Sequence, residues 1–174
     1  MTLKEINKKF GTDKGGKHCY LERYYEPTFS SIRESTKKLL EIGVYEGASI
    51  RLWREYFPSA EIFALEILQK RAGMFNDDSM VHLTIGSSTH KSAYENIPFD
   101  LDIIIDDGSH RPDDQYKTFF QAYQHLREGG LYIIEDVRDR SALQDLVSEY
   151  KDKLEIFDYS KEAEPDTIIF QIKK

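Results

Sequence analysis

The sequence has little cysteine and no long apolar run, and both absences narrow the class of protein that it encodes. Cys19 is the single cysteine among 174 residues, so the chain cannot form an internal disulfide, which suits a reducing compartment. No apolar run approaches the roughly 18 residues that a membrane-spanning helix needs. Residues 1–10 lack the apolar core of a signal peptide, which disfavours export. We therefore expect a cytoplasmic protein without a membrane span.

Basic charge is also scarce. The chain has 24 Lys and Arg residues against 31 Asp and Glu residues, a net charge of −7, and its one clearly basic stretch, residues 8–17, is short. Nucleic acid as the main partner is therefore disfavoured. The length fits a single domain with one sizeable core. We expect residues 1–174 to form one domain, with a lid and helices in residues 1–36 and a Rossmann-like core in residues 37–174.

A third absence is the glycine loop of dinucleotide-binding proteins. The turn Gly43-Val-Tyr-Glu-Gly47 follows an apolar run, but it lacks the G-x-G-x-x-G spacing that cradles a pyrophosphate. Glu41 and Glu46 add negative charge that would repel a pyrophosphate. The turn therefore favours a cationic ligand, and a nicotinamide-dependent dehydrogenase is disfavoured.

Short apolar runs alternate with helical patterns along most of the chain, which is typical of an α/β fold. Strands are expected at residues 38–44, 60–67, 81–86, 101–106, 131–136, 153–158 and 167–172. A helix from Pro112 should end at Gly129-Gly130, and Ser141 should cap the next helix. The last strand should be antiparallel, because its short acidic connector leaves no room for a crossover helix. The pattern thus predicts a Rossmann-like, mostly parallel seven-stranded sheet with helices on both faces.

The amino-terminal region contains a turn-rich loop between two helical patterns. Thr2-x-x-Glu5 is a capping box for a first helix, and Tyr20, Tyr24 and Tyr25 follow at roughly helical spacing. The loop between them, residues 11–18, is either a fixed glycine turn that leads into a core helix or a lid over a ligand. The three tyrosines are expected to pack in the core or the lid.

Carboxylates gather where two apolar runs end. Asp106, Asp107 and His110 follow one expected strand, and Glu135 and Asp136 follow the next. Ligands of open α/β sheets bind outside the carboxyl ends of the strands, so these side chains should face one crevice.

An adenosine site is indicated by an acid at the end of the second strand. Glu66 follows Gly43 at about the 20-residue distance at which nucleotide-binding α/β folds place the partner of the ribose hydroxyls. A cationic ligand that carries adenosine suggests S-adenosylmethionine. Ser87, in the turn after the third strand, could meet the adenine.

Four motifs, in this order, resemble the macrocin and mycinamicin O-methyltransferase family of class I S-adenosylmethionine enzymes. They are Gly11-Thr-Asp-Lys14, Leu40-Glu-Ile-Gly-Val-Tyr-Glu-Gly47, Ile105-Asp-Asp-Gly-Ser-His110 and Ile133-Ile-Glu-Asp136. The resemblance covers nearly the whole chain and implies a magnesium ion held by Asp107, Glu135 and Asp136. It also implies that His110 is the general base. Bound Mg²⁺ would orient an acceptor hydroxyl and lower its pKa.

The cofactor assignment covers residues from the loop, the turn and the strand ends. S-adenosylmethionine is expected to contact Asp13, Glu41, Gly43, Tyr45, Glu46, Ser49, Glu66, Ser87 and Asp106. Other readings stay open, since Asp106 could support neighbouring backbone amides, His110 could satisfy a turn, and single carboxylates at strand ends are often helix caps or solvated loop residues.

The acceptor is expected to be a hydroxyl of a sugar, glycan or natural product. Members of this family are generally longer, with extra segments that build the acceptor pocket, and here only the loop 160–166 could serve. In a homo-oligomer, a second subunit could also supply part of the acceptor pocket. The alternative function is a non-catalytic S-adenosylmethionine-binding module with structural carboxylates.

Overall fold

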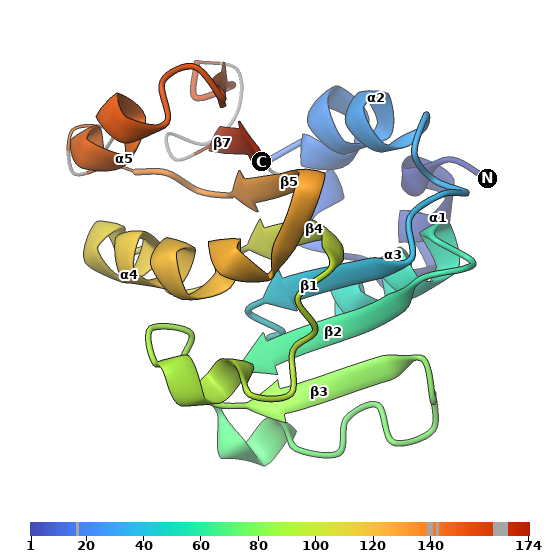
Figure 1. Ribbon diagram of the computed structural model, residues 1–174. Coiled ribbons are helices and arrows are strands. Elements are labelled where there is room, and N and C mark those ends of the chain that lie inside the picture. Colours follow the sequence, from blue (N-terminus) through green and yellow to red (C-terminus); the bar gives the residue numbers. More distant parts are fainter. Residues whose placement is uncertain (17, 139–140, 142, 162–166) are drawn as a thin grey trace.

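The computed structural model describes residues 1–16, 18–138, 141, 143–161 and 167–174. Within these residues seven strands form one sheet in the order β3-β2-β1-β4-β5-β7-β6 (Figure 1). The strands are β1 Lys38–Ile42, β2 Glu61–Glu66, β3 Val81–Ile85, β4 Leu101–Asp106, β5 Leu126–Ile134, β6 Leu154–Asp158 and β7 Ile168–Lys173. Strands β1 to β5 pair in parallel, whereas β7 is antiparallel to both β5 and β6. The predicted fold class, including the antiparallel last strand, is confirmed.

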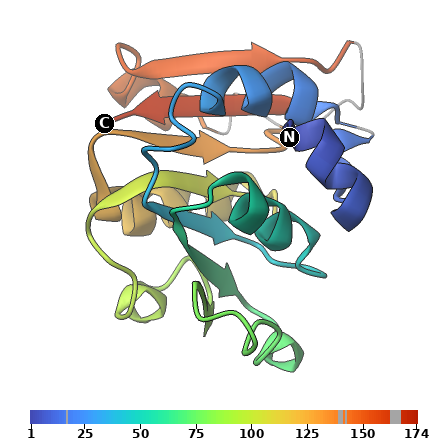
Figure 2. The ribbon, with the colours of Figure 1, turned by 90° about the vertical axis from the view of Figure 1, so that its right-hand side faces the viewer.

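Helices cover both faces of this sheet. The α-helices are α1 Leu3–Phe10, α2 Glu26–Phe29, α3 Ala48–Tyr56, α4 Pro112–Ala122 and α5 Gln144–Glu149, and the shorter turns are η1 Asp13–Gly15, η2 Leu21–Tyr25, η3 Gln69–Arg71, η4 Lys91–Tyr94 and η5 Tyr123–His125. Figure 2 shows α1, α2 and α3 in front of the sheet, with α4 behind it. Among the described residues, no helix is long and apolar enough to cross a bilayer.

Successive strand residues pack into opposite layers of the core, because side chains alternate between the faces of a sheet. In β1, Leu39 packs with the amino-terminal helices and α3, and Leu40 packs with α4 and α5. Both side chains are fully buried. This two-sided burial explains why adjacent residues in β1 and β4, such as Leu39-Leu40 and Ile103-Ile104-Ile105, are apolar.

The register of the parallel strands brings their carboxyl ends level with one another. Ile42 at the end of β1 lies opposite Leu65 of β2 and Asp106 of β4, and Asp106 lies opposite Ile134 of β5. The chain runs outward from β1 to β2 and β3, and then returns to add β4 on the other side of β1. Such a reversal of strand order opens a crevice at the carboxyl ends, where ligands of α/β sheets bind.

Two predicted boundaries are wrong. Gly129 and Gly130 do not end α4, which stops at Ala122 and passes through η5 into β5. Both glycines lie inside β5, where the pairing with β4 shifts register and the φ angle of Gly129 is +74°. Glycine is common at such irregularities in strands, as it is at the ends of helices. Ser141 does not cap α5 either, because this helix begins at Gln144 with Leu143 in the N-cap position.

The remaining amino-terminal and carboxyl-terminal predictions have mixed outcomes. The capping box is confirmed, since the Thr2 hydroxyl accepts from the Glu5 amide and the Glu5 carboxylate accepts from the Thr2 amide. The loop 160–166 falls mostly outside the described residues.

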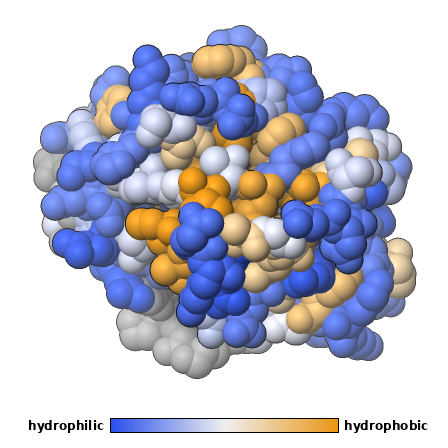
Figure 3. All heavy atoms as spheres, turned by 90° about the horizontal axis from the view of Figure 1, so that it is seen from below, coloured by the Kyte–Doolittle hydropathy of each residue, from blue (hydrophilic) through white to orange (hydrophobic). Residues whose placement is uncertain are grey.

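At the β3 edge of the sheet, opposite β6, the side chains of β3 are half-buried or exposed. Figure 3 views this side of the molecule, where apolar residues gather in the middle of a largely hydrophilic face.

Candidate active site

A cavity of about 910 Å³ lies at the carboxyl ends of β1, β2 and β4. Its walls come from the loop after α1, the turn between β1 and α3, and the segments after β2, β3 and β4. It therefore collects most of the predicted cofactor residues together with one predicted metal ligand and the predicted general base. These lining residues are Asp13, Gly43, Tyr45, Glu46, Ser49, Glu66, Ser87, Asp107 and His110.

The turn after β1 is shaped by glycine. Gly43 has a φ angle of +91°, and a Cβ atom at this position would lie 2.0 Å from the carbonyl oxygen of Asp107. Gly47 has a φ angle of +77° and leads into α3. Tyr45 between them also adopts a left-handed conformation, with φ at +48°, and its side chain is 75% exposed at the cavity. Because only glycine avoids the clash at position 43, this turn can approach the metal-binding candidate Asp107 closely.

Replacing Gly43 by Ala should therefore destabilise the fold more than a positive φ angle alone explains. Gly11→Ala is the matched control, because Gly11 has a φ angle of +72° and nothing within 4 Å of the added Cβ. We expect the control to lose about 1 kcal/mol of unfolding free energy and Gly43→Ala to lose about 2 kcal/mol more, as in overpacked cores. Urea unfolding measures both. Equal losses would show that the contact with Asp107 relaxes freely.

Glu66 is held at the cavity wall by backbone amides. Its Oε2 accepts from the amides of Val44 at 3.2 Å and Tyr45 at 3.1 Å, and its Oε1 accepts from the amide of Leu68 at 2.9 Å. The residue is only 6% exposed, yet it lines the cavity. These bonds fix its carboxylate while leaving lone pairs for a further donor.

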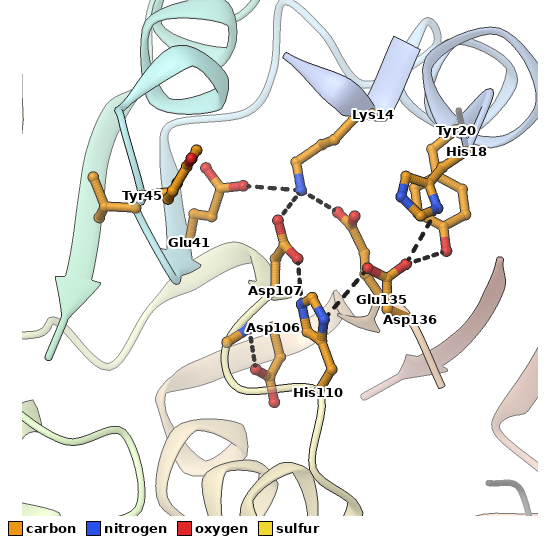
Figure 4. Close-up of polar contacts among 12 residues, drawn as sticks. Lys14, His18, Tyr20, Glu41, Tyr45, Asp106, Asp107, His110, Glu135 and Asp136 are labelled. Carbon is orange, nitrogen blue, oxygen red and sulfur yellow. Dashed lines mark hydrogen bonds and ion pairs between the residues drawn. The ribbon is translucent and has the colours of Figure 1, made fainter. Parts of the chain in front are cut away.

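Beside the cavity, a buried lysine lies among three carboxylates (Figure 4). The ammonium of Lys14, which is 2% exposed, donates to Asp107 Oδ2 and to Glu135 Oε1, the latter at 2.8 Å. Glu41 Oε1 lies 3.4 Å from the same nitrogen. Tyr25 also donates its hydroxyl to Glu135 Oε1. The loop 11–18 thus supplies a charged side chain to the site, and its role as a lid stays a prediction.

A second set of contacts surrounds His110. Its Nε2 lies 3.0 Å from Asp107 Oδ1 and its Nδ1 lies 3.5 Å from Asp136 Oδ2. Tyr20 donates its hydroxyl to Asp136 Oδ1 at 2.6 Å, and His18 Nδ1 lies 3.7 Å from the same oxygen. His110 and Asp136 both have positive φ angles, +56° and +52°. Such conformations are uncommon outside glycine and cluster at functional sites.

The pKa values follow from the burial of these groups. Burial raises the pKa of Glu135 well above its usual range, and it also raises the pKa of Asp136. Burial opposes ionisation of Asp107, but the Lys14 ammonium and the hydrogen bond with His110 hold its pKa below the usual value. The bond to Asp107 in turn raises the pKa of His110. Ionisation of these buried acids therefore depends on nearby positive charge, part of which Lys14 supplies.

Two of the three predicted metal ligands, Asp107 and Asp136, lie where they could hold a metal ion together with His110. Asp107, His110 and Asp136 each offer a ligand atom, and these atoms lie within 4.8 Å of one another. Glu135, the third predicted carboxylate, is adjacent but is 1% exposed and engaged by Lys14 and Tyr25. Carboxylate oxygens are the donors that Mg²⁺ prefers. The predicted ligands thus come together, and their roles stay predictions.

Two predicted cofactor residues do not line the cavity. Glu41 is fully buried below the turn, where it accepts from Trp53 Nε1 at 3.1 Å, and burial raises its pKa to about 7. Asp106 is 2% exposed, and its Oδ1 accepts from the Gly108 amide at 3.3 Å. Burial raises the pKa of Asp106 to about 7 as well. The alternative reading of Asp106, support of a neighbouring backbone amide, describes its position better.

The contacts of Lys14, Tyr20 and Tyr25 with the carboxylates were not predicted from the sequence. The tyrosines are buried as expected, but their hydroxyls bind the carboxylates of Asp136 and Glu135. One signal was available: so many carboxylates at buried strand ends require donors and a counter-charge, and Lys14 belongs to a quoted motif. What the pattern could not show was that residues more than 90 positions apart meet.

Comparison with known proteins agrees with this arrangement. A family described as a methyltransferase domain matches residues 40–137. The chain belongs to this methyltransferase family. A tetracenomycin-pathway rhamnosyl 3'-O-methyltransferase of Streptomyces olivaceus is 33% identical over 147 residues, which cover 78% of this chain. Mycinamicin VI 2''-O-methyltransferase of Micromonospora griseorubida is 31% identical over the same share.

The methyltransferase fold is also shared with a solved structure. The mycinamycin-pathway methyltransferase MycE, in complex with Mg, S-adenosylhomocysteine and mycinamycin VI, has a TM-score of 0.79 at 24% identity. The match covers 100% of this methyltransferase chain and 54% of MycE. Against both curated relatives the match covers 36% of their length. This methyltransferase domain therefore corresponds to about a third of those enzymes.

Proposed function

We propose that this chain is an S-adenosylmethionine-dependent O-methyltransferase that uses Mg²⁺ and acts on a hydroxyl of a sugar-containing acceptor. One observation carries the proposal: the cavity with Gly43 and Glu66 in its walls also contains Asp107 and His110. A cofactor in this cavity would therefore lie against the carboxylate cluster. The relatives support the acceptor class, since one is named as a methyltransferase of a rhamnosyl-tetracenomycin and the other as a methyltransferase of mycinamicin VI.

The protein's own residues account for binding of the cofactor. Glu66, fixed by three amides, accepts from the ribose hydroxyls. The turn after β1 lets the ligand approach the backbone at Gly43. Asp13 and Glu46, both exposed at the cavity, supply negative charge that suits a sulfonium and repels a pyrophosphate.

Asp107, Glu135 and Asp136 would hold the metal, because carboxylate oxygens are the ligands that Mg²⁺ prefers. When bound, Mg²⁺ supplies Lewis-acid stabilisation of the acceptor oxygen. His110 takes the hydroxyl proton. Its Nδ1 is the nitrogen for this step, because its 3.5 Å separation from Asp136 is the longer of its two carboxylate contacts. Positioning of the two reactants in one site supplies much of the remaining acceleration.

One observation favours the non-catalytic alternative, a module that only binds S-adenosylmethionine. Lys14, Tyr20 and Tyr25 already satisfy the carboxylates without any metal. In that case cofactor would bind with no Mg²⁺ dependence and no methyl transfer.

A methyl-transfer screen separates the two functions. The full chain is incubated with labelled S-adenosylmethionine and a panel of glycosides, sugar nucleotides and glycan fragments, with Mg²⁺ or with chelator. Labelled product that requires Mg²⁺ supports the enzyme. Cofactor binding in calorimetry without product from any acceptor supports the binding module, and binding of NAD in place of S-adenosylmethionine would contradict both.

Replacing Glu66 by Ala should weaken S-adenosylmethionine and S-adenosylhomocysteine alike. The loss should be about 1.5–3 kcal/mol, the usual value for a shielded bond to a charged group. Isothermal titration calorimetry measures it. Glu61→Ala is the control, because Glu61 begins the same strand at the end away from the cavity. Since Glu66→Ala also leaves three amides without their acceptor, thermal unfolding must show that the variant is folded. Unchanged affinity would remove Glu66 from the ribose site.

A further inference from the structure

The position of the Lys14 ammonium relative to the predicted metal ligands carries one inference beyond the reaction itself. Its nitrogen lies 2.8 Å from Glu135 Oε1, and it donates to Asp107 Oδ2 as well. Mg²⁺ binds oxygens at about 2.1 Å. A metal on these same two oxygens would therefore lie within about 5 Å of the ammonium. Since Lys14 is only 2% exposed, little water is present to screen the two positive charges.

We infer that Lys14 is a tethered counter-ion of the metal-free site, and that a divalent cation displaces it when it binds between Asp107 and Glu135. The inference rests on the metal site of the proposed function. Lys14 donates two bonds to the carboxylates and lies 3.4 Å from a third, Glu41, so it neutralises part of their charge when no metal is bound. In the metal-free protein Lys14 reduces the repulsion among these carboxylates. It also lowers the affinity for the metal, because the cation must first replace the ammonium.

Displacement of Lys14 also has a consequence for the cavity. Lys14 lies in η1, directly after Gly11, Thr12 and Asp13, which line the cavity. The backbone of this turn is held by the bonds from the Gly15 amide to Thr12 and from the Gly16 amide to Asp13. A released ammonium removes one anchor of η1 and leaves the two hydrogen bonds between Asn7 and Thr12. Metal binding is thus coupled to the wall of the cofactor cavity.

The test is calorimetric titration of Mg²⁺ into the full chain, with Lys14→Met as the main variant. Met has a similar length and no charge, so the carboxylates remain and the competing cation is removed. We expect Lys14→Met to bind Mg²⁺ at least about tenfold more tightly than the unmodified chain, because no buried ion pair has to be broken. Lys14→Arg keeps the charge and should stay closer to the unmodified chain than to Lys14→Met.

Lys8→Met is the matched control. Lys8 is exposed on α1, so this variant has the same change in net charge without touching the carboxylates. Its Mg²⁺ affinity should equal that of the unmodified chain within about threefold. If Lys8→Met gained as much Mg²⁺ affinity as Lys14→Met, the gain would come from the change in net charge alone. That result would overturn the inference.

A second measurement does not depend on affinity. Hydrogen exchange of the Gly15 and Gly16 amides should become faster when Mg²⁺ is added to the unmodified chain, because their turn loses the anchor. In Lys14→Met the exchange should not respond to Mg²⁺. If this variant unfolds without metal, refolding in the presence of Mg²⁺ should restore it, and failure to refold with metal would contradict the inference.

The outcomes separate this inference from the proposed function. Equal or weaker Mg²⁺ binding by Lys14→Met means that the metal lies on the His110 side of Asp107 and that Lys14 stays in place. The inference then fails while the metal site stands. Absence of Mg²⁺ binding by both proteins overturns the inference together with the metal in the proposed function, and it favours the non-catalytic binding module.

Discussion

Replacing Asp107 by Asn should abolish Mg²⁺-dependent methyl transfer while leaving the affinity for S-adenosylmethionine within a few-fold. Asp107 is the point at which the two halves of the cluster meet, because one of its oxygens faces Lys14 and the other faces His110. An amide keeps the shape of the side chain but loses its charge. Changes to residues that only support metal ligands cost about 10–100-fold, so loss of a direct ligand should cost at least about 100-fold.

The measurement is turnover against Mg²⁺ concentration, with cofactor affinity from calorimetry on the same preparations. Asp113→Asn is the control, since Asp113 is exposed in the first turn of α4 and undergoes the same change in charge. The Asp107 variant should stay folded, because Lys14 retains its contacts with Glu135 and Glu41. Full activity of the unmodified chain in chelator would refute a metal-assisted mechanism, whatever the variant does.

The architecture could be predicted because its signals are local. Each buried parallel strand appears as a short apolar run, and each run that ends in Asp or Glu marks the carboxyl edge of the sheet. The rule that ligands bind at this edge was enough to bring Asp107 and His110 to one cavity. The same reasoning assigned Glu41 and Asp106 to the cavity, but both end up buried beside it. Proximity in sequence to a strand end does not fix the direction of a side chain.

The errors come from features that depend on partners distant in the sequence. Two consecutive glycines such as Gly129 and Gly130 are typical of a helix end. Here, however, Leu126 already pairs with Leu101 of β4, so both glycines lie within β5. Lys14 looks like part of a solvated loop until Asp107 and Glu135 are placed around it. No local pattern reports such contacts. Burial of a lysine becomes predictable only when the unpaired charge of its future partners is considered.

Replacing His110 by Asn should reduce turnover by roughly 10²–10⁴-fold, the usual contribution of a positioned general base. Asparagine is the better test than alanine alone, because His110 has a φ angle of +56° and Asn tolerates the left-handed conformation. The side chain remains polar and can still donate to Asp107, but it cannot accept a proton at neutral pH. Mg²⁺ affinity should therefore change little, in contrast to the Asp107 variant.

The two roles of His110 that the geometry allows give opposite results. As a base, His110 produces a fall in turnover at acidic pH as its imidazole protonates. Both His110→Asn and His110→Ala should lose that acidic limb along with the rate. If His110 instead only satisfies the turn between β4 and α4, the variants should lose unfolding free energy but keep the acidic limb and most of their turnover. Rate against pH, measured with saturating Mg²⁺ and an accepted acceptor, separates the two, because a purely structural histidine cannot shape the pH dependence of the chemical step.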